Sequence, residues 1–340
     1  METNNMKFVA KVYDDVLSQL DCALIGQKKV KKVVASSLLC DTNSRILLTG
    51  GTGFGKSTLS DFVATSFKTE RIEVTSDLLP SEIQKSLTTA VIPKEENYSD
   101  IQKQVIEEKN FRLLQVEELN RANARAQSAF IELFDKNQIT TDEKIYHFQD
   151  FYVIATQNNE EVAGIFNVPL AIYDRFGVSV SYDDLSEEEL RNLLFGYFQP
   201  SKKSHLNEFF INTVKKEVES FHLTKVDEDM MLAICKKIDT MVLHNKKLFA
   251  GSNYRAHAFA LKLVKLMALS SERNYLMPTD ILDFIEPLYM HRINQNVAQI
   301  GDENVKELFD DMKLKIRNLN RKNPCFDDTK IYVKGFGKRK

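Results

Sequence analysis

The stretch Arg45–Thr58, RILLTGGTGFGKST, decides the fold of this chain. Its apolar run Ile46–Leu48 predicts a buried strand, and the residues from Gly50 to Ser57 fit the phosphate-loop pattern G-x-x-x-x-G-K-[ST]. The segment Thr58–Phe67 has the apolar spacing of a helix. A strand, a glycine-rich turn and a helix in this order form a cradle for nucleotide phosphates.

Each residue type of this loop has its own task in holding a triphosphate. The glycines let the backbone turn tightly and bring successive N–H groups close to phosphate oxygens. Lys56 would reach the β- and γ-phosphates as a point charge, and the Ser57 hydroxyl would coordinate Mg²⁺. The sequence therefore predicts binding of a nucleoside triphosphate. The predicted binding residues are Gly50, Gly51, Thr52, Gly53, Phe54, Gly55, Lys56, Ser57 and Thr58.

Length and composition fit a globular protein of two or three domains. The 340 residues are 43% hydrophobic and 28% charged, and the formal net charge of −2 gives no overall sign of a nucleic-acid binder. No apolar run has the length of a membrane span, and the first residues do not fit a signal peptide. The cysteines Cys22, Cys40, Cys235 and Cys325 are far apart and fit reduced thiols, so we expect a cytoplasmic protein.

A second apolar strand is predicted at Phe111–Val116 and ends in two acids, Glu117 and Glu118. In phosphate-loop proteins, a strand of this kind delivers a carboxylate to the metal ion, which is the role expected for Glu117. Glu118 would polarise the attacking water as a general base. The pair therefore predicts hydrolysis as well as binding.

Other positions allow two interpretations on the residues alone. The apolar segment with Ile25 and Gly26 could line an adenine pocket or form a plain turn between helices. Asn158 follows a strongly apolar strand, where a polar side chain can point into a ligand crevice or simply begin a loop. Arg175 could pair with Asp174 or project from the surface.

Strand and helix patterns divide the chain into two parts. Strands alternate with helical patterns from residue 45 to 182, which predicts a parallel sheet covered by helices. A capping signal at Ser186 then begins a helical region that extends to about residue 297, with its last long helix expected to begin at Met277–Asp280. The tail from Lys313 to Lys340 is basic, as expected for a solvated terminus or for a segment that docks on an acidic partner.

Six ordered motifs resemble those of MoxR-type AAA+ ATPases, in the helix-2-insert group. Besides the phosphate loop they are Arg71–Ile83, Glu117–Ala129, Val153–Asn158, Tyr173–Phe176 and Gly251–Ala256. The resemblance implies an α/β fold with an AAA+ αβα nucleotide-binding domain over residues 1–184, built on a parallel central sheet. It further implies an all-α lid over 185–300 and a helical, then basic tail over 301–340. The helix-2 insert would lie within about 78–110 and a hairpin at about 138–149.

The resemblance also implies roles for the ambiguous positions. Ile25 and Gly26 fall where the family has its adenine-side motif. Asn158 matches sensor 1, which positions the lytic water, and Arg255 matches sensor 2, which reports on the γ-phosphate. Arg175 matches the arginine finger, which acts on ATP held by the neighbouring subunit. The active site would then lie between subunits of a ring, in this family usually a hexamer.

Two departures from the family pattern concern the loop and the acidic strand. Glu117 stands where the family usually has Asp, and the added methylene could disturb Mg²⁺ and slow hydrolysis. The loop also lacks a frequent Pro pair, although Gly51 and Thr52 are sterically permissive.

We expect an Mg-dependent ATPase ring that remodels or matures a protein client, as a chaperone does. The client would be a separate protein, and the resemblance suggests one with a von Willebrand factor A domain. Two alternatives are a nucleotide-gated ring scaffold with weak hydrolysis and a nucleic-acid-associated AAA+ subunit. Only the basic tail supports the latter.

Overall fold

The computed structural model describes most of the chain, and its residues form two compact units. The described residues are 2–90, 106–108, 110–140, 145–158, 165–244, 253–293 and 302–320. Residues 11–216 form one unit, here called the sheet unit. Residues 1–10 together with 217–340 form the other, called the helical unit.

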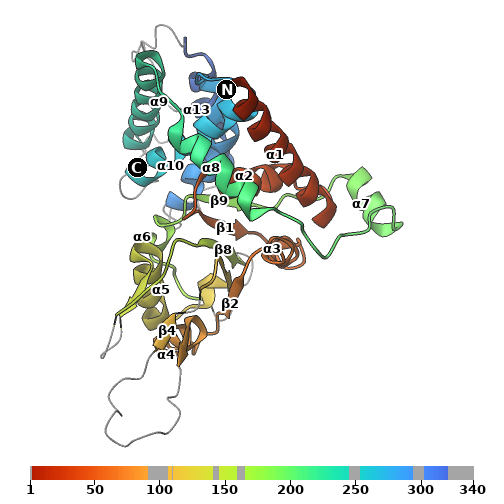
Figure 1. Ribbon diagram of the computed structural model, residues 1–340, viewed down its shortest axis with the longest axis vertical. Coiled ribbons are helices and arrows are strands. Elements are labelled where there is room, and N and C mark those ends of the chain that lie inside the picture. The colour runs from red at the N-terminus through yellow and green to blue at the C-terminus, as the bar shows by residue number, and fades with distance from the viewer. Residues whose placement is uncertain are drawn as a thin grey trace, which may run out of the picture. The chain divides into compact units, whose positions relative to one another are not determined.

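The sheet unit is built on five parallel strands in the order β2-β5-β8-β1-β9 (Figure 1). Every residue of β1, β5 and β8 is buried, because these three strands lie in the middle of the sheet with helices over both faces. The predicted parallel sheet is therefore confirmed. The strands are β1 (Arg45–Thr49), β2 (Thr69–Glu73), β5 (Leu113–Glu117), β8 (Tyr152–Gln157) and β9 (Val178–Ser181).

Helices cover the sheet in two layers. On one face, α2 (Lys28–Cys40) contacts β1 and β9, and α3 (Lys56–Ala64) contacts β5 and β8. The other face is covered by α4 (Pro80–Leu87), α5 (Ala124–Lys136) and α6 (Leu170–Tyr173), which contact one another in this order. Figure 1 shows α3 on the opposite side of the sheet from α5 and α6.

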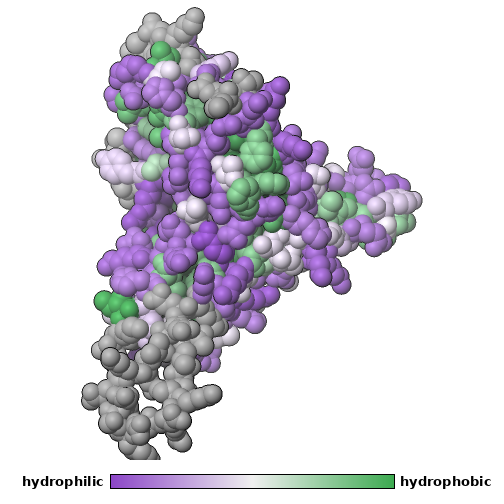
Figure 2. Space-filling model, in the orientation of Figure 1, coloured by the Kyte–Doolittle hydropathy of each residue, from purple (hydrophilic) through white to green (hydrophobic). Residues whose placement is uncertain are grey.

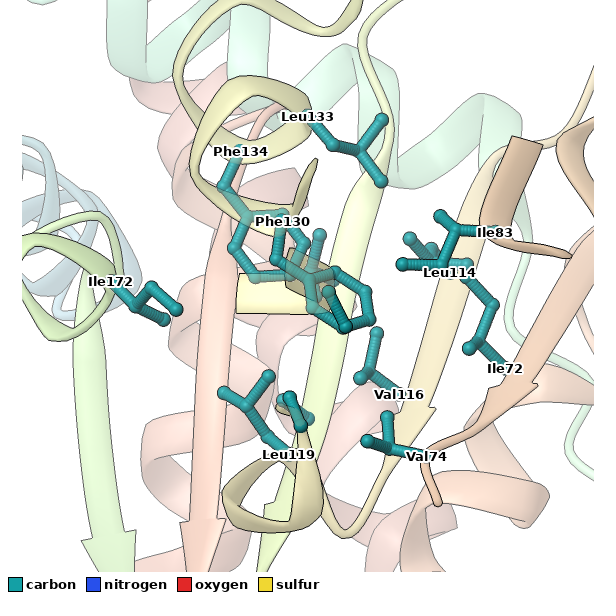
Figure 3. Close-up of a cluster of buried hydrophobic side chains, with 14 of the residues drawn as sticks. Ile72, Val74, Ile83, Leu114, Val116, Leu119, Phe130, Leu133, Phe134 and Ile172 are labelled. Atoms are coloured by element: carbon teal, nitrogen blue, oxygen red, sulfur yellow. The ribbon is translucent and has the colours of Figure 1, made fainter. Parts of the chain in front are cut away.

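The core of the sheet unit lies between α5 and the sheet (Figure 3). Phe130 and Phe134, one helical turn apart, are fully or almost fully buried, and their ring centroids are 5.5 Å apart. Asn123 begins α5 as its N-cap, since its side chain accepts hydrogen bonds from Arg125 N and Ala126 N. The N-cap therefore fixes where α5 begins, after the strand that ends in Glu117 and the short 3₁₀ helix Leu119–Arg121.

Two small antiparallel pairs extend from the sheet unit. β3 (Thr88–Ala90) pairs with β4 (Ile106–Glu108) inside the predicted insert, and residues 91–105 and 109 lie outside the described residues. β6 (Gln138–Thr140) pairs with β7 (Ile145–His147), which confirms the predicted hairpin strands, although residues 141–144 lie outside the described part.

The helix α7 (Glu187–Leu194) exposes apolar side chains. Ser186 is the N-cap that the sequence predicted, and together with Glu189 it forms a capping box. Figure 2 shows hydrophobic residues over α7, at the right of the view. The exposed ones on α7 and just after it are Leu190, Leu193, Leu194, Phe195 and Tyr197.

The segment after α7 belongs to the sheet unit, whereas the sequence pattern placed it with the helices. The Ser204 hydroxyl donates to Phe62 O at 2.8 Å, and Ser204 N donates to the Thr65 hydroxyl at 2.9 Å, so this segment lies on the end of α3. The predicted domain limits at residues 184 and 300 stay a prediction.

In the helical unit, no long helix begins at Met277–Asp280 among the described residues, so that expectation was wrong. A 3₁₀ helix, η2 (Pro278–Phe284), is followed by the short α11 (Ile285–Tyr289) and a second 3₁₀ turn, η3 (Met290–Arg292). Pro287 explains the break, because it cannot donate to the carbonyl four residues earlier. The other helices of this unit are α9 (Lys225–His244), α10 (Tyr254–Ser270) and α13 (Asp302–Arg317), and α1 (Glu2–Ala23) and α8 (Glu208–Ser220) have residues in both units.

None of the described helices is long and apolar enough to cross a membrane. The tail residues 321–340, with Cys325, lie outside the described residues.

Candidate nucleotide site

The candidate site lies at the carboxyl edge of the sheet, where three central strands end. β1 leads into the phosphate loop, β5 ends in Glu117, and β8 leads to Asn158. Because the strands are parallel and adjacent in the order β5-β8-β1, their ends meet at one edge. Residues distant in sequence are brought together there.

The phosphate loop connects β1 to the first turn of α3. Gly55, the N-cap of α3, has φ +91°, and a Cβ at this position would lie 2.5 Å from Leu24 Cδ1. Only glycine fits here without a shift, because the backbone is left-handed and the space is taken. The Lys56 ammonium donates to the carbonyls of Gly50 and Gly51 at 2.7 and 2.6 Å, so it lies over the loop.

Glu117 is held by two hydroxyl groups from neighbouring elements. Ser57 Oγ donates to Glu117 Oε2 at 3.0 Å, and Thr156 Oγ1 donates to the same oxygen at 2.7 Å. The other oxygen, Oε1, is buried without a hydrogen-bond partner, and Arg71 Nη2 lies 3.9 Å from it. Glu117 Oε1 accepts no hydrogen bond, and the Ser57 hydroxyl lies next to the same carboxylate. These oxygen atoms are ligands of the kind that Mg²⁺ binds.

Glu118 has a left-handed backbone with φ +58° and ψ +49°. This conformation is rare for residues other than glycine, and here Glu118 N donates to the Thr156 hydroxyl at 3.0 Å. The carboxylate lies 2.6 Å from Arg121 Nε, and both side chains are partly exposed. The structure therefore pairs Glu118 with a cation that the sequence analysis did not consider.

Asn158 lies directly against the phosphate loop. Its side-chain amide donates to the Thr52 hydroxyl at 2.9 Å, and its carbonyl accepts from Asn120 Nδ2 at 2.7 Å. The residue is 8% exposed. The polar strand end therefore faces the loop and the acids, which is the first of the two arrangements that the sequence allowed.

A cavity of about 350 Å³ lies among these residues. Three of its lining side chains, Arg71, Glu73 and Thr156, were missed by sequence reasoning. Arg71 and Glu73 lie on β2, whose register places Glu73 beside Glu117, and Thr156 lies on β8. The alternating pattern of β2 indicates which of its side chains share a face. Only the order of the strands shows that β2 lies beside β5. The full lining is Thr52, Gly53, Gly55, Lys56, Ser57, Thr58, Arg71, Glu73, Glu117, Glu118, Thr156 and Asn158.

Ile25 and Gly26 are not among the residues that line this cavity, but their turn lies beside the loop through Leu24. The next residue, Gln27, fixes the turn to the segment after β9. Its amide donates to Asp183 O at 2.5 Å and accepts from Asp183 N at 3.1 Å. The predicted adenine-side position is thus adjacent to the loop and held in place.

Arg175 and Arg255 are not among the residues that line the cavity. Arg175 precedes β9 and lies at the amino edge of the sheet, where Gly177 N donates to Arg45 O. It pairs with Asp135, at 3.3 Å from Nη2 to Oδ2, an arrangement that the sequence analysis did not consider. Arg255 is exposed in the first turn of α10, in the helical unit.

No group of three or more His, Cys, Asp or Glu side chains is arranged for a metal in the described ranges. This finding is consistent with Mg²⁺, which is commonly bound by one or two protein carboxylates together with substrate phosphates and water.

Comparisons with known proteins agree with this geometry. Residues 45–178 match the family described as "ATPase family associated with various cellular activities (AAA)". The chain is 25% identical over 292 residues to the chaperone MoxR1 of Mycobacterium tuberculosis, covering 82% of this chain and 75% of that protein. It is 26% identical over 187 residues to the protein MoxR of Paracoccus denitrificans, covering 54% and 53% of the two chains.

A solved crystal structure has a similar fold. It is a candidate ATPase from Cytophaga hutchinsonii, with a TM-score of 0.69 and 22% identity, and the match covers 93% of this chain and 97% of that one.

The parallel sheet, the phosphate loop and the acidic strand end, together with the match over residues 45–178, support an AAA+ ATPase. Within that class, the relatives named MoxR support a MoxR-type AAA+ ATPase.

Proposed function

We propose that the cavity at the carboxyl edge binds Mg·ATP and that this chain hydrolyses it with residues from two subunits. The observation that carries the proposal is the convergence of Lys56, Ser57, Glu117, Glu118 and Asn158 on one cavity. Ser57 and Glu117 would hold Mg²⁺, which would neutralise charge on the β- and γ-phosphates. Lys56 would exchange the loop carbonyls for phosphate oxygens.

Hydrolysis needs an oriented water and a base. Asn158 would position the water next to the γ-phosphate, and Glu118 would accept its proton as the water oxygen attacks phosphorus. The bond to the β-phosphate oxygen then breaks, and ADP and inorganic phosphate are released. Glu118 must first leave Arg121, and their partly exposed pair is weak enough to separate.

Arg175 would act on the nucleotide of a neighbouring subunit. It lies at the amino edge of the sheet, and the five residues of β1 separate the two edges by roughly 16 Å at about 3.3 Å per residue. An arginine side chain does not span that distance within one subunit. A head-to-tail ring, for which we propose a hexamer, would supply the missing arginine. Arg255 would report on the γ-phosphate from the helical unit.

The ring would remodel or mature a protein client in the cytoplasm. Support comes from the relatives, one of which is named a chaperone. A client with a von Willebrand factor A domain and the pore-facing position of the β6–β7 hairpin are parts of the same proposal. Nucleic acid is the less favoured partner, given the net charge of −2.

One observation favours a second candidate, a nucleotide-gated scaffold with weak hydrolysis. Glu118 is paired with Arg121, and Glu117 already accepts two hydroxyl hydrogen bonds through Oε2. These three contacts would keep the acids away from a water at the γ-phosphate. In this case, ATP occupancy would assemble the ring and turnover would be incidental.

Steady-state ATP hydrolysis across a series of subunit concentrations tests the two candidates. For a shared site, activity per subunit rises with concentration, and Arg175→Ala abolishes it while ATP still binds. Glu118→Gln should then bind ATP without turnover. Tight ATP binding with no turnover in the wild type would instead support the scaffold. Activity that is independent of concentration and of Arg175 would contradict the shared site.

A further inference from the structure

Arg175 is folded onto its own subunit, although its proposed task is on a neighbour. Its Nη2 lies 3.3 Å from Asp135 Oδ2, and its Nη1 donates to Ala171 O at 2.5 Å. The Arg175 side chain is only 14% exposed, and its Nε is buried without a hydrogen-bond partner. An arginine that must reach another subunit is therefore mostly covered here.

The surroundings of Arg175 contain a second arginine. Arg45 is buried at the start of β1, and its Nη2 donates to Asn137 Oδ1 at 3.0 Å. Burial lowers the pKa of Arg45 to about 10, and the nearby charge of Arg175 acts in the same direction. The two guanidinium groups therefore repel each other.

The acids in this region differ in their contacts with the two arginines. Asp135 forms the ion pair with Arg175. Asp150 accepts instead from Asn137 Nδ2 at 3.0 Å and lies among the acids that favour the charged form of Arg45, as do Asp41 and Asp135. Asp135 is thus the carboxylate in direct contact with Arg175, and Asp150 provides a matched control one contact away.

We propose that Asp135 is a positioning residue that holds Arg175 in the unassembled subunit and releases it when a neighbour presents nucleotide. The inference rests on the proposed function, because a hold on Arg175 matters only if this arginine acts on the next subunit. Asp135 lies on α5, and Arg175 lies in the turn after α6. Their ion pair therefore connects two neighbouring elements of the same layer.

Arg175 can exchange Asp135 for a phosphate group, because the ion pair is weak and the phosphate is a good acceptor. The Asp135 side chain is 31% exposed, and ion pairs that water reaches contribute little to stability. A phosphate offers several charged oxygens and accepts paired hydrogen bonds from a guanidinium group, so it competes well with a single aspartate oxygen. Without nucleotide from a neighbour, Asp135 and Ala171 O keep the arginine covered.

Arginine-specific labelling tests the hold directly and without ATPase activity. The full chain, diluted and without nucleotide, is treated with phenylglyoxal, and modification of Arg175 is followed by peptide mass spectrometry. Asp135→Asn should be labelled at Arg175 several-fold faster than the wild type, whereas Asp150→Asn should be labelled at the wild-type rate. Exposed Arg125 serves as the internal reference. Equal rates at Arg175 in the wild type and Asp135→Asn would overturn the proposal.

The concentration series for ATP hydrolysis tests the consequence. Asp135→Asn should reach half-maximal activity at a several-fold lower subunit concentration, and adding Asp135→Asn to Arg175→Ala should have no effect. If Asp135→Asn alone lowers the plateau to that of Arg175→Ala, then Asp135 supports the active position and the inference is wrong. If Arg175→Ala behaves as the wild type, the proposed function fails, while the labelling result still decides whether Asp135 holds Arg175.

Discussion

Thr156 Oγ1 lies 2.7 Å from Glu117 Oε2 and also accepts a hydrogen bond from Glu118 N at 3.0 Å. One hydroxyl at the end of β8 therefore fixes both acids that end the neighbouring strand β5. Thr156 is 2% exposed, so water cannot readily replace it. The carboxylate proposed for the metal and the residue proposed as the base share this support.

Replacing Thr156 by valine should loosen both acids at nearly constant volume. A hydrogen bond to a charged group contributes about 1.5–3 kcal/mol, so we expect the free energy of unfolding to fall by about 2 kcal/mol. Mg²⁺ should half-saturate ATPase activity at a higher concentration. Urea unfolding and a Mg²⁺ titration measure the two effects. Thr156→Ser keeps the hydroxyl and should stay close to the wild type; an equal loss in both variants would argue against the hydrogen bonds.

Removing Arg121 should free Glu118. Their ion pair, 2.6 Å long, has side chains that are 33% and 41% exposed. Such pairs contribute about 0.2–1 kcal/mol, so Arg121→Ala should raise kcat for ATP by roughly 1.5- to 5-fold if Glu118 acts as the base. Arg125→Ala, at an exposed position of the same segment, is the control. A fall in kcat for Arg121→Ala alone would mean that Arg121 assists hydrolysis.

Sequence reasoning placed the phosphate loop between a strand and a helix and the two acids at a strand end, as the structure does, while their roles stay predictions. The phosphate loop and the acids at the end of β5 are local patterns, because one turn and one strand end determine where their side chains point. The sheet also followed from local periodicity. The roles given to Asn158, Arg175 and Arg255 came only from resemblance, and they stay predictions.

The remaining features depend on contacts between distant segments. Arg71 lines the cavity because β2 pairs with β5. The sequence of neither strand indicates that the two are paired. Arg175 meets Asp135 across 40 positions, through the packing of α5 against the turn after α6. Pro287 indicates that the helix predicted from Met277 is interrupted. The capping signal before it nevertheless favoured a continuous helix.

Binding of nucleotide should stabilise the protein only when Lys56 is present. A ligand at about 100 times its Kd adds about 2.7 kcal/mol to the free energy of unfolding. For a unit of about 200 residues this corresponds to a rise in Tm of roughly 5–10 °C. Lys56→Ala should lose most of this rise, while its Tm without nucleotide should change little. Thermal unfolding with and without Mg·ATP measures both, and a full shift in the variant would contradict the loop assignment.

The core beneath the acidic strand should be sensitive to lost volume. Phe130 is fully buried among the residues that Figure 3 shows against the sheet. Phe130→Ala should lower the free energy of unfolding by about 3–5 kcal/mol, because it removes buried contacts and leaves a cavity. Leu194→Ala on α7, where the side chain is 69% exposed, should change it by less than about 0.5 kcal/mol. Similar losses in urea unfolding would contradict the assignment of the core.

Arg71 should contribute to triphosphate binding by its charge. It lies in the cavity beside Glu73, Glu117 and Glu118, whose carboxylates would otherwise repel a polyphosphate. Its side chain is 48% exposed, so water screens it, and an interaction of about 1 kcal/mol corresponds to a fivefold rise in Kd for ATP in Arg71→Gln. The rise should shrink at high salt, since partly exposed charges are screened. Titration calorimetry at two salt concentrations measures this, with Arg125→Gln as the control outside the cavity. A salt-independent loss would indicate that Arg71 acts by positioning Glu117 rather than by its field on the phosphates.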